Sequence, residues 1–325
     1  MVDFAPLFPL LVPSFSSKGN LLLPQSDGKY ISDNYSLLQE MDLRVSKSYL
    51  ISAYDIYYGL MPQNPNDMPE TEYLFIDSGG YETNDSFDLS ERNKFNYKVM
   101  PWDKDKMKEV YCQVTACSKF QNAVTILSIN DTIGPFEQQL TEAVSLSEEF
   151  PNAVINFIIK MCFPFEYLLD KIDQTKNYLQ SIQIIGITEK ELGYTVRDRL
   201  KNLIQIKKRL SSSGWNGSIH IFGGLEPNLA KLYYFAGADI FDGLSWQRMF
   251  YRNNASLYNP ESFYISLPEH ENKFLMMVDN LSILQEVSNN LSTLFDMRTT
   301  KMNLLESNLV SKDMTIKELL DIMEV

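Results

Sequence analysis

Short apolar stretches alternate with longer amphipathic ones through most of the chain. Apolar runs of strand length recur at residues 7–15, 48–54, 73–77, 123–129, 153–160, 182–187, 218–222 and 238–241. The segments between the later runs carry apolar residues at helical spacing, at 103–119, 136–149, 165–179, 194–211 and 227–236. Strands that alternate with helices in this way are typical of βαβ units and a parallel sheet. The pattern predicts about seven or eight parallel strands.

Glycines and acidic residues gather where the predicted strands end. Asp77-Ser-Gly-Gly80 closes the run at 73–77, Gly223-Gly224 follows the run at 218–222, and Asp242 follows the run at 238–241. A barrel keeps its chemistry at the carboxyl ends of its strands, so this arrangement favours a (β/α)8 TIM barrel. The alternative is an open doubly wound sheet, and the absence of GxGxxG after the first strand weakens it.

The two ends of the chain depart from the regular alternation. Prolines in residues 7–15 suit an edge strand or the start of a barrel, and Ser26-Asp-Gly-Lys29 indicates a hairpin. Residues 83–101 form a long polar segment of the kind that often serves as a lid or a binding loop. Beyond residue 244 the sequence is aromatic and irregular, and residues 269–325 have the spacing of two or three helices. We predict a barrel over 1–250 and a C-terminal helical extension, 251–325, packed on it.

Composition narrows the class of protein. The chain has 325 residues with 44% hydrophobic and 22% charged positions, values ordinary for a globular protein. No apolar run approaches the roughly 20 residues of a membrane-spanning helix, and the N-terminus lacks the basic region of a signal peptide. We therefore expect a cytoplasmic protein without a membrane partner. The three cysteines, in no CxxC, predict neither a disulfide framework nor a zinc site.

The net charge of −13 argues against broad, non-specific binding to nucleic acid. Lys201, Lys207, Lys208 and Arg209 share one predicted helix and could form a local basic patch, although a solvated helix face is the favoured interpretation. One of the two histidines, His220, alternates with apolar residues in a predicted strand. We interpret it as an interior or rim histidine rather than a metal ligand.

Four segments carry a resemblance to a known family. Asp77-Ser-Gly-Gly-Tyr-Glu82 resembles the Asp-Ser-Gly-Gly-Phe-Gln motif of the tRNA-guanine transglycosylase superfamily, the queuine and archaeosine tRNA-ribosyltransferases. Gly237-Ala-Asp-Ile-Phe-Asp242 is similar to its Gly-x-Asp-x-Phe-Asp segment, and Gly223-Gly-x-x-Pro227 to the Gly-x-Gly-x-Pro segment before it. Ser52-Ala-Tyr-Asp-Ile-Tyr-Tyr-Gly59 is similar to its Asn-Thr-Tyr-His-Leu strand and loop. Order and rough spacing agree over about residues 10–250.

The resemblance implies a TIM barrel that exchanges a purine base in a nucleic acid. By motif, Asp242 corresponds to the nucleophile that attacks the ribose C1′, and Asp77 to the acid/base that handles the proton of the base. Such a reaction suits two carboxylates, one ionised for attack on an oxocarbenium-like centre and one able to carry a proton. The alternative is that each aspartate merely caps a helix or closes a turn. Asp239 is the weaker candidate because alternation places it where the strand begins.

Base recognition in the family uses an acid, a glutamine and glycine backbone amides. The acid falls at Asn130 or Asp131, and we favour Asp131 because a carboxylate can accept from two purine N–H groups together. The glutamine position falls within residues 156–160 and is unmatched. Gly186 is either a backbone contact or a strand-end turn, and Tyr81 either stacks on the base or belongs to the core. The candidate substrate-binding residues are Ser78, Gly79, Gly80, Tyr81, Asp131, Gly186, Gly223, Gly224 and Arg248.

The sequence also departs from the family. The Cys-x-Cys-x-x-Cys…His zinc site that follows the nucleophile is absent, no RNA-binding appendage follows the barrel, and the usual Pro-Thr-Arg is here Ser245-Trp-Gln-Arg248. The loss of zinc resembles divergent members that insert 7-deazaguanines into DNA. We therefore expect no metal or other cofactor, and a nucleic-acid substrate, DNA or tRNA, with a 7-deazaguanine-type base. A protein partner could supply nucleic-acid binding. The alternatives are a non-catalytic partner subunit and an N-glycosidase acting on free nucleosides.

Overall fold

The structure is a computed structural model that describes residues 9–17, 22–24, 30–41, 45, 47–83, 99–129, 133–252, 255–258 and 269–296. Most of the predicted loop at 83–101, namely residues 84–98, lies outside this part of the chain, as does Asp131. Among the described residues, no helix combines the length and the apolar character needed to cross a membrane.

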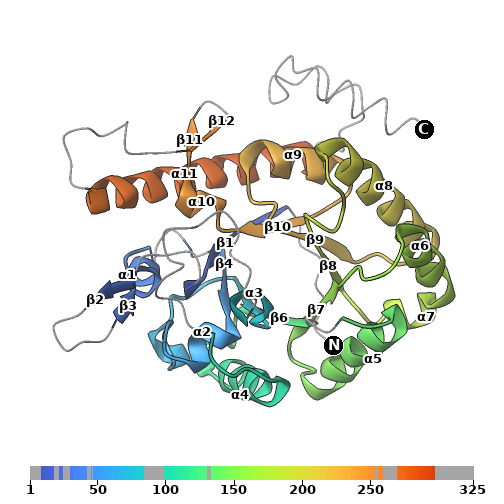
Figure 1. The fold of residues 1–325 in the computed structure, drawn as a ribbon, viewed down its shortest axis with the longest axis horizontal. Coiled ribbons are helices and arrows are strands. Elements are labelled where there is room, and N and C mark those ends of the chain that lie inside the picture. The colour runs from blue at the N-terminus through green and yellow to red at the C-terminus, as the bar shows by residue number, and fades with distance from the viewer. Residues whose placement is uncertain are drawn as a thin grey trace.

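Eight parallel strands close into a barrel, which confirms the predicted TIM-barrel fold (Figure 1). Around the barrel the strands follow the order β1-β10-β9-β8-β7-β6-β5-β4. Chain order and spatial order agree because each crossover carries the chain to the neighbouring parallel strand. The strands are β1 (Leu10–Phe15), β4 (Ser48–Ser52), β5 (Tyr73–Asp77), β6 (Val124–Ile129), β7 (Val154–Ile159), β8 (Ile184–Thr188), β9 (Ser218–Phe222) and β10 (Ile240–Gly243).

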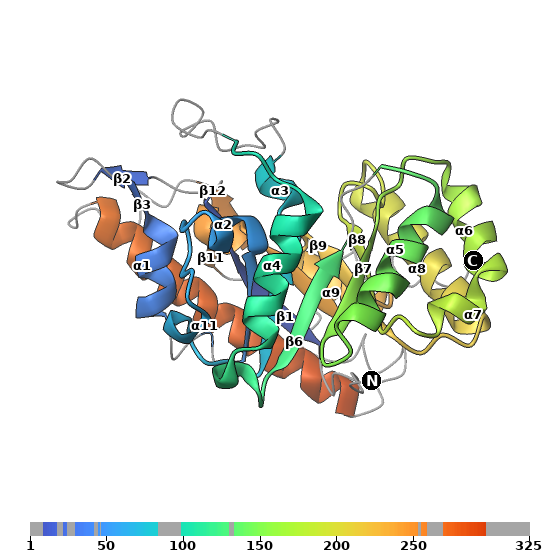
Figure 2. The same ribbon diagram turned by 90° about the horizontal axis from the view of Figure 1, so that it is seen from below.

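Helices surround the barrel (Figure 2). Several of them begin where the sequence supplies a capping side chain. Asp103, Thr195 and Glu226 accept bonds from the first-turn amides of α4, α8 and α9. The predicted helix at 165–179 is in fact two, because the chain breaks at Thr175. The outer helices are α2 (Ala53–Tyr57), α4 (Lys104–Thr115), α5 (Phe136–Glu149), α6 (Phe165–Gln174), α7 (Lys176–Leu179), α8 (Val196–Ser212) and α9 (Pro227–Phe235).

The segments outside the alternation are more ordered than the sequence predicted. The hairpin is confirmed, since β2 (Leu22–Pro24) pairs antiparallel with β3 (Tyr30–Ser32), and α1 (Asp33–Glu40) follows it. The prediction of an irregular segment after residue 244 is wrong. It contains α10 (Ser245–Arg248) and an antiparallel pair, β11 (Met249–Arg252) with β12 (Ala255–Tyr258).

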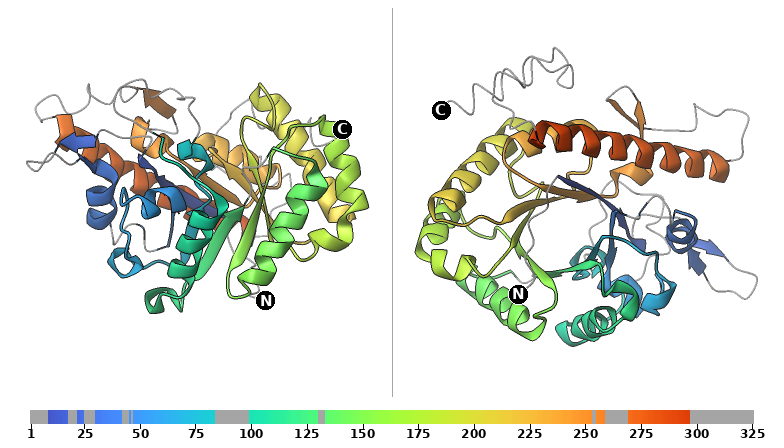
Figure 3. Two further views of the ribbon diagram at one scale, coloured as in Figure 1. Left: turned by 60° about the horizontal axis from the view of Figure 1, so that its bottom comes forward. Right: turned by 180° about the vertical axis from the view of Figure 1, so that it is seen from behind.

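The C-terminal helix α11 (Glu269–Asp296) lies along the outside of the barrel next to β1 and α9 (Figures 1 and 3). Asn280 fastens it to the segment after Asp242. The Asn280 amide donates to the carbonyls of Trp246 and Met249, both at 2.6 Å, and accepts from the Tyr251 N–H at 2.9 Å. The helix therefore fixes the backbone that follows the predicted nucleophile.

Alternation along the strands divides the barrel interior into two levels. The lower level is an apolar plug of Leu10, Val12, Leu50, Phe75, Ile126, Val154, Ile184 and Ile240. Two residues further along each strand, the same inward face carries mostly polar residues. These residues, which we call the polar layer, are Ser14, Ser52, Asp77, Ser128, Asn156, Gly186, His220 and Asp242.

A glycine turn joins β5 to the short helix α3 (Gly80–Thr83), which lies beyond the carboxyl ends of the strands (Figure 2). Gly79 has φ +95, and a Cβ there would lie 2.8 Å from both Trp102 Nε1 and Tyr54 Cβ. The Trp102 indole also donates to the Ser78 carbonyl at 2.9 Å. The turn can pack this closely under Trp102 only because residue 79 has no side chain.

Replacing Gly79 tests this packing. We expect Gly79→Ala to lose about 2–5 kcal/mol in the free energy of unfolding, from backbone strain of about 1–2 kcal/mol and overpacking of about 1–3 kcal/mol. Gly214→Ala is the matched control, because Gly214 has φ +85 but only a side-chain atom 3.8 Å from the added Cβ. The Gly214→Ala variant should lose only the part of the free energy of unfolding that comes from backbone strain. Urea denaturation measures both, and equal losses would contradict the close packing at Gly79.

Candidate active site

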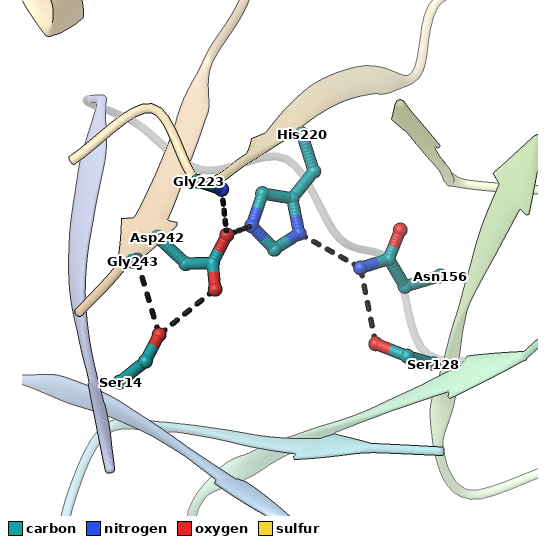
Figure 4. Close-up of polar contacts among 7 residues, drawn as sticks. All are labelled: Ser14, Ser128, Asn156, His220, Gly223, Asp242 and Gly243. Atoms are coloured by element: carbon teal, nitrogen blue, oxygen red, sulfur yellow. Dashed lines mark hydrogen bonds and ion pairs between the residues drawn. The ribbon is translucent and has the colours of Figure 1, made fainter. Parts of the chain in front are cut away.

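Asp242 lies near the end of β10 on the inner face of the barrel and is only 6% exposed (Figure 4). Its Oδ2 accepts from Ser14 Oγ at 2.8 Å, and its Oδ1 accepts from the Gly223 N–H at 3.1 Å. The positive φ of Gly223, +81, turns its N–H toward the carboxylate. Ser14 Oγ in turn accepts from the Gly243 N–H at 3.1 Å. The carboxylate is therefore held in one orientation by groups from three parts of the barrel.

His220 lies beside Asp242, fully buried. Its Nε2 is 3.3 Å from Asp242 Oδ1, and its Nδ1 is 2.8 Å from Asn156 Nδ2. The edge of Phe75, on the opposite side of the barrel, meets the imidazole at a centroid distance of 5.6 Å, and Phe222 stacks on it at 4.0 Å. The predicted interior position of His220 is confirmed. Its contact with the candidate nucleophile was not predicted.

Gly186 leaves the gap that allows side chains from β7 and β9 to meet across β8. A Cβ at this position would lie 2.6 Å from the Phe222 ring and 2.9 Å from Asn156 Oδ1. Neither neighbour is the free end of a flexible chain, so any other residue would push Asn156 or Phe222 away. Gly186 thus has a packing role that sequence analysis missed. A contact of its backbone with substrate stays a prediction.

A second group of carboxyls lies at the carboxyl ends of β4 and β5. Asp77 ends β5 and pairs in register with Ser52 of β4. Asp55, in α2, accepts from both the N–H and the Oγ of Ser17, the former at 2.8 Å. Glu82, in α3, accepts from Ser16 Oγ. Asp55 and Glu82, which we call the acid pair, are both completely buried.

Burial raises the pKa of both members of the acid pair. The pKa of Asp55 rises to about 7 through desolvation, opposed by its bonds to Ser17, and the charge of Asp77 raises it further. The pKa of Glu82 rises to about 8 through desolvation and the charge of Asp55. Asp77 therefore has neighbours that hold protons near neutral pH. Sequence analysis did not single out Asp55 or Glu82. Both lie in segments that resemble family motifs, at positions where those motifs have His and Gln.

Two connections link Asp242 to this second group. The first is the end of β1 and its continuation, where Ser14 bonds Asp242, Ser16 bonds Glu82 and Ser17 bonds Asp55. The second joins two predicted substrate-binding residues. Arg248 Nη2 donates to Tyr81 Oη at 3.1 Å, although the residues are 167 positions apart in the chain. The segment 77–82 and the segment that follows Asp242 therefore meet at one end of the barrel.

The other predicted residues occupy structural positions near this end. Ser78 is buried under Trp102, Gly80 begins α3, and Gly224 lies in the turn after β9, where a Cβ would come within 2.9 Å of Ile221. Asp131 lies outside the described residues. Within the described part of the chain, no group of three His, Cys, Asp or Glu side chains could hold a metal ion.

Asp239 lies at the opposite end of its strand, as alternation predicted. Its Oδ2 accepts from the Ile219 N–H at 3.1 Å and lies 3.8 Å from Lys207 Nζ. The Arg209 guanidinium pairs with Asp173, 2.5 Å away. Lys207 and Arg209 are therefore engaged with acidic neighbours on the outer face, which supports the solvated-face interpretation of α8.

Comparison of the sequence with models of protein families finds no match, and comparison with curated protein sequences finds none either.

The acid pair makes stability depend on pH. Because the folded-state pKa of each carboxyl lies above its unfolded value, the folded protein binds more protons between about pH 4 and pH 8. Stability should therefore fall as the pH rises from 5 to 8, by about 1.4 kcal/mol for each unit of pKa shift. We expect the double variant Asp55→Asn, Glu82→Gln to flatten this slope in urea unfolding.

The matched control is Glu137→Gln on the surface. Lys171 holds the pKa of Glu137 below its usual value, so this carboxyl titrates below the chosen window. The variant should keep the wild-type slope between pH 5 and pH 8. A double variant whose slope equals that of the wild type would show that the acid pair does not hold protons.

Proposed function

We propose that this protein is a base-exchange glycosyltransferase of the tRNA-guanine transglycosylase type. It replaces guanine in a nucleic acid by a 7-deazaguanine-type base. One observation carries the proposal: a buried carboxylate, Asp242, accepts from two donors at the carboxyl end of the barrel and lies 3.3 Å from His220 Nε2. Asp77 supports it, on the same inner face and inside the motif whose Tyr81 contacts Arg248.

The contacts of Asp242 indicate which oxygen reacts. Oδ1 faces both the Gly223 N–H and His220 Nε2, whereas within the described residues Oδ2 accepts from Ser14 alone. A carboxylate oxygen has two lone pairs, so Oδ2 keeps one for substrate. Oδ2 attacks the ribose C1′, the new O–C1′ bond forms and the bond from C1′ to N9 of guanine breaks.

Asp77 handles the proton in both halves of the exchange. In the first half it gives a proton to the departing guanine. In the second half it takes a proton from N9 of the incoming base, N9 attacks C1′, and the bond from C1′ to Asp242 Oδ2 breaks. When the acid pair holds its protons it adds no negative charge beside Asp77, which favours the ionised form of Asp77 that takes the proton from the incoming base.

The segment after Asp242 supports a substrate that differs from the usual tRNA. The side chains of Trp246 and Gln247 turn inward and donate to the Ser14 carbonyl, at 3.1 and 2.9 Å. The half-buried Arg248, which follows them, contacts Tyr81 near the mouth of the barrel, where its guanidinium suits a backbone phosphate. With a net charge of −13, the chain supplies little general attraction for a polyanion. We favour DNA or a non-standard nucleic acid, bound with the help of a partner protein.

The decisive test removes the nucleophile. We expect Asp242→Ala to abolish incorporation of labelled guanine into nucleic acid, together with any adduct that survives denaturing electrophoresis. Asp242→Asn should remain folded, because its amide can accept from Ser14 or Gly223, and should be equally inactive. The assay uses tRNA and double-stranded DNA, each with and without extract fractions that supply a partner.

Asp239→Asn is the matched control, since this aspartate lies three residues earlier at the opposite end of the strand. It should exchange guanine at the wild-type rate. Exchange by Asp242→Ala at that rate would overturn the mechanism. Exchange that depends wholly on a partner's own aspartate would show a non-catalytic subunit, and base release from free nucleosides alone would show an N-glycosidase.

A further inference from the structure

A buried chain of polar side chains lies behind Asp242, and two of its members, Ser128 and Asn156, have no place in the exchange described above (Figure 4). It runs from Ser128 on β6 through Asn156 on β7 to His220 on β9. Asn156 Nδ2 is 3.3 Å from Ser128 Oγ and 2.8 Å from His220 Nδ1. All three side chains are 0% exposed. Buried polar groups are retained when each satisfies another, so the chain constrains the state of the imidazole.

The Nε2 end of the imidazole faces a carboxylate. It lies 3.3 Å from Asp242 Oδ1, and Asp242 is the charged group in contact with the ring. The other contacts of the ring, Asn156, Phe75 and Phe222, are uncharged. A bare ring nitrogen would point its lone pair at the carboxylate, which is repulsive. Nε2 therefore carries a hydrogen.

The Nδ1 end faces an amide donor. The two hydrogens of Asn156 Nδ2 have two acceptors, His220 Nδ1 and Ser128 Oγ. Among the described residues Asn156 Oδ1 has no hydrogen-bond partner, and it lies beside Gly186. Turning the amide over would place an NH2 group there instead, and an unpaired buried donor is rarer in proteins than an under-satisfied carbonyl oxygen. Nδ1 is therefore bare.

We propose that His220 is a positioning residue for Asp242. It is a neutral imidazole whose Nε2–H faces Oδ1 across 3.3 Å and leaves Oδ2 to react, and the Asn156 amide sets its tautomer. His220 transfers no proton. The consequence for catalysis rests on the proposed function, whereas the tautomer rests on the contacts alone.

The tautomer can be observed directly, because the chain has only two histidines. His270→Gln, in α11, leaves His220 as the sole imidazole. With ¹⁵N-labelled histidine, a long-range ¹H–¹⁵N spectrum at pH 7.5 should show Nε2 as the protonated, pyrrole-like nitrogen and Nδ1 as the bare, pyridine-like one. A proton on Nδ1, in either the imidazolium or the other neutral tautomer, would overturn the proposal.

Two variants test whether Asn156 determines the tautomer of His220. Asn156→Asp replaces the donor by an acceptor of the same shape, so Nδ1 should gain a hydrogen and its resonance should become pyrrole-like. Ser128→Ala removes the other partner of Nδ2 and should leave the tautomer unchanged. An Asn156→Asp spectrum identical to that of the parent would show that Asn156 does not set the tautomer.

Kinetics test the positioning role. His220→Phe removes the donor and should lower kcat about 10²-fold, the size of effect seen when one preorganised donor is lost from an active site, with KM little changed. His220→Gln offers an amide N–H and should recover most of the rate. A folded His220→Phe protein with wild-type kcat would refute the positioning role even if the tautomer is as proposed. If no variant, including the parent, exchanges bases, the proposed function fails while the spectra still decide the tautomer.

Discussion

The structure depends on holding one carboxylate inside the barrel. An ionised carboxylate taken from water into an apolar interior loses several kcal/mol of solvation unless donors replace the water. Asp242 receives these donors from β1 and from the turn after β9, and His220 Nε2 lies 3.3 Å from its Oδ1. Each donor needs a particular backbone. Ser14 must face inward near the end of β1, Gly223 must turn at positive φ, and His220 must have space across β8.

The end of β1 is where the two halves of the site are joined. Its successive serines bond Asp242, Glu82 and Asp55, and the side chains of Trp246 and Gln247 hold the carbonyl of Ser14 from behind. Asn280 of α11 then fastens the backbone of Trp246 and Met249. A continuous set of contacts thus runs from the outermost helix to the buried carboxylates. The far C-terminal part of the described chain supports the site although it contributes no side chain to it.

Much of the fold follows from the periodicity of apolar residues along the chain. The boundaries of β5, β9 and α5 agree with the sequence because apolar alternation and helical spacing stop there at turn or capping residues. The prediction of β10 began two residues early, because the Ala238 N–H still bonds the Tyr233 carbonyl at the end of α9. The hairpin β11–β12 was missed because its strands are only four residues each and carry no clear alternation. The inner-face placement of Asp77 and Asp242 follows from period two alone.

The partners of those aspartates could not be predicted, because they depend on which strands face each other. Asn156 and His220 can meet because Gly186, which lies between them, has no side chain. Ser16 and Ser17 belong to a polar N-terminal segment, in which nothing in the sequence marks them as partners of the carboxyls. These partners create two opposite environments for carboxyls at one end of the barrel. Asp242 lies among N–H and O–H donors that suit an anion, whereas the acid pair lies in a desolvated setting beside other carboxyls, which favours protons. A reaction that needs one carboxylate to attack and another to carry a proton requires that separation. The fold provides it by placing donors on the β1–β10 side and apolar burial on the β4–β5 side of the same opening.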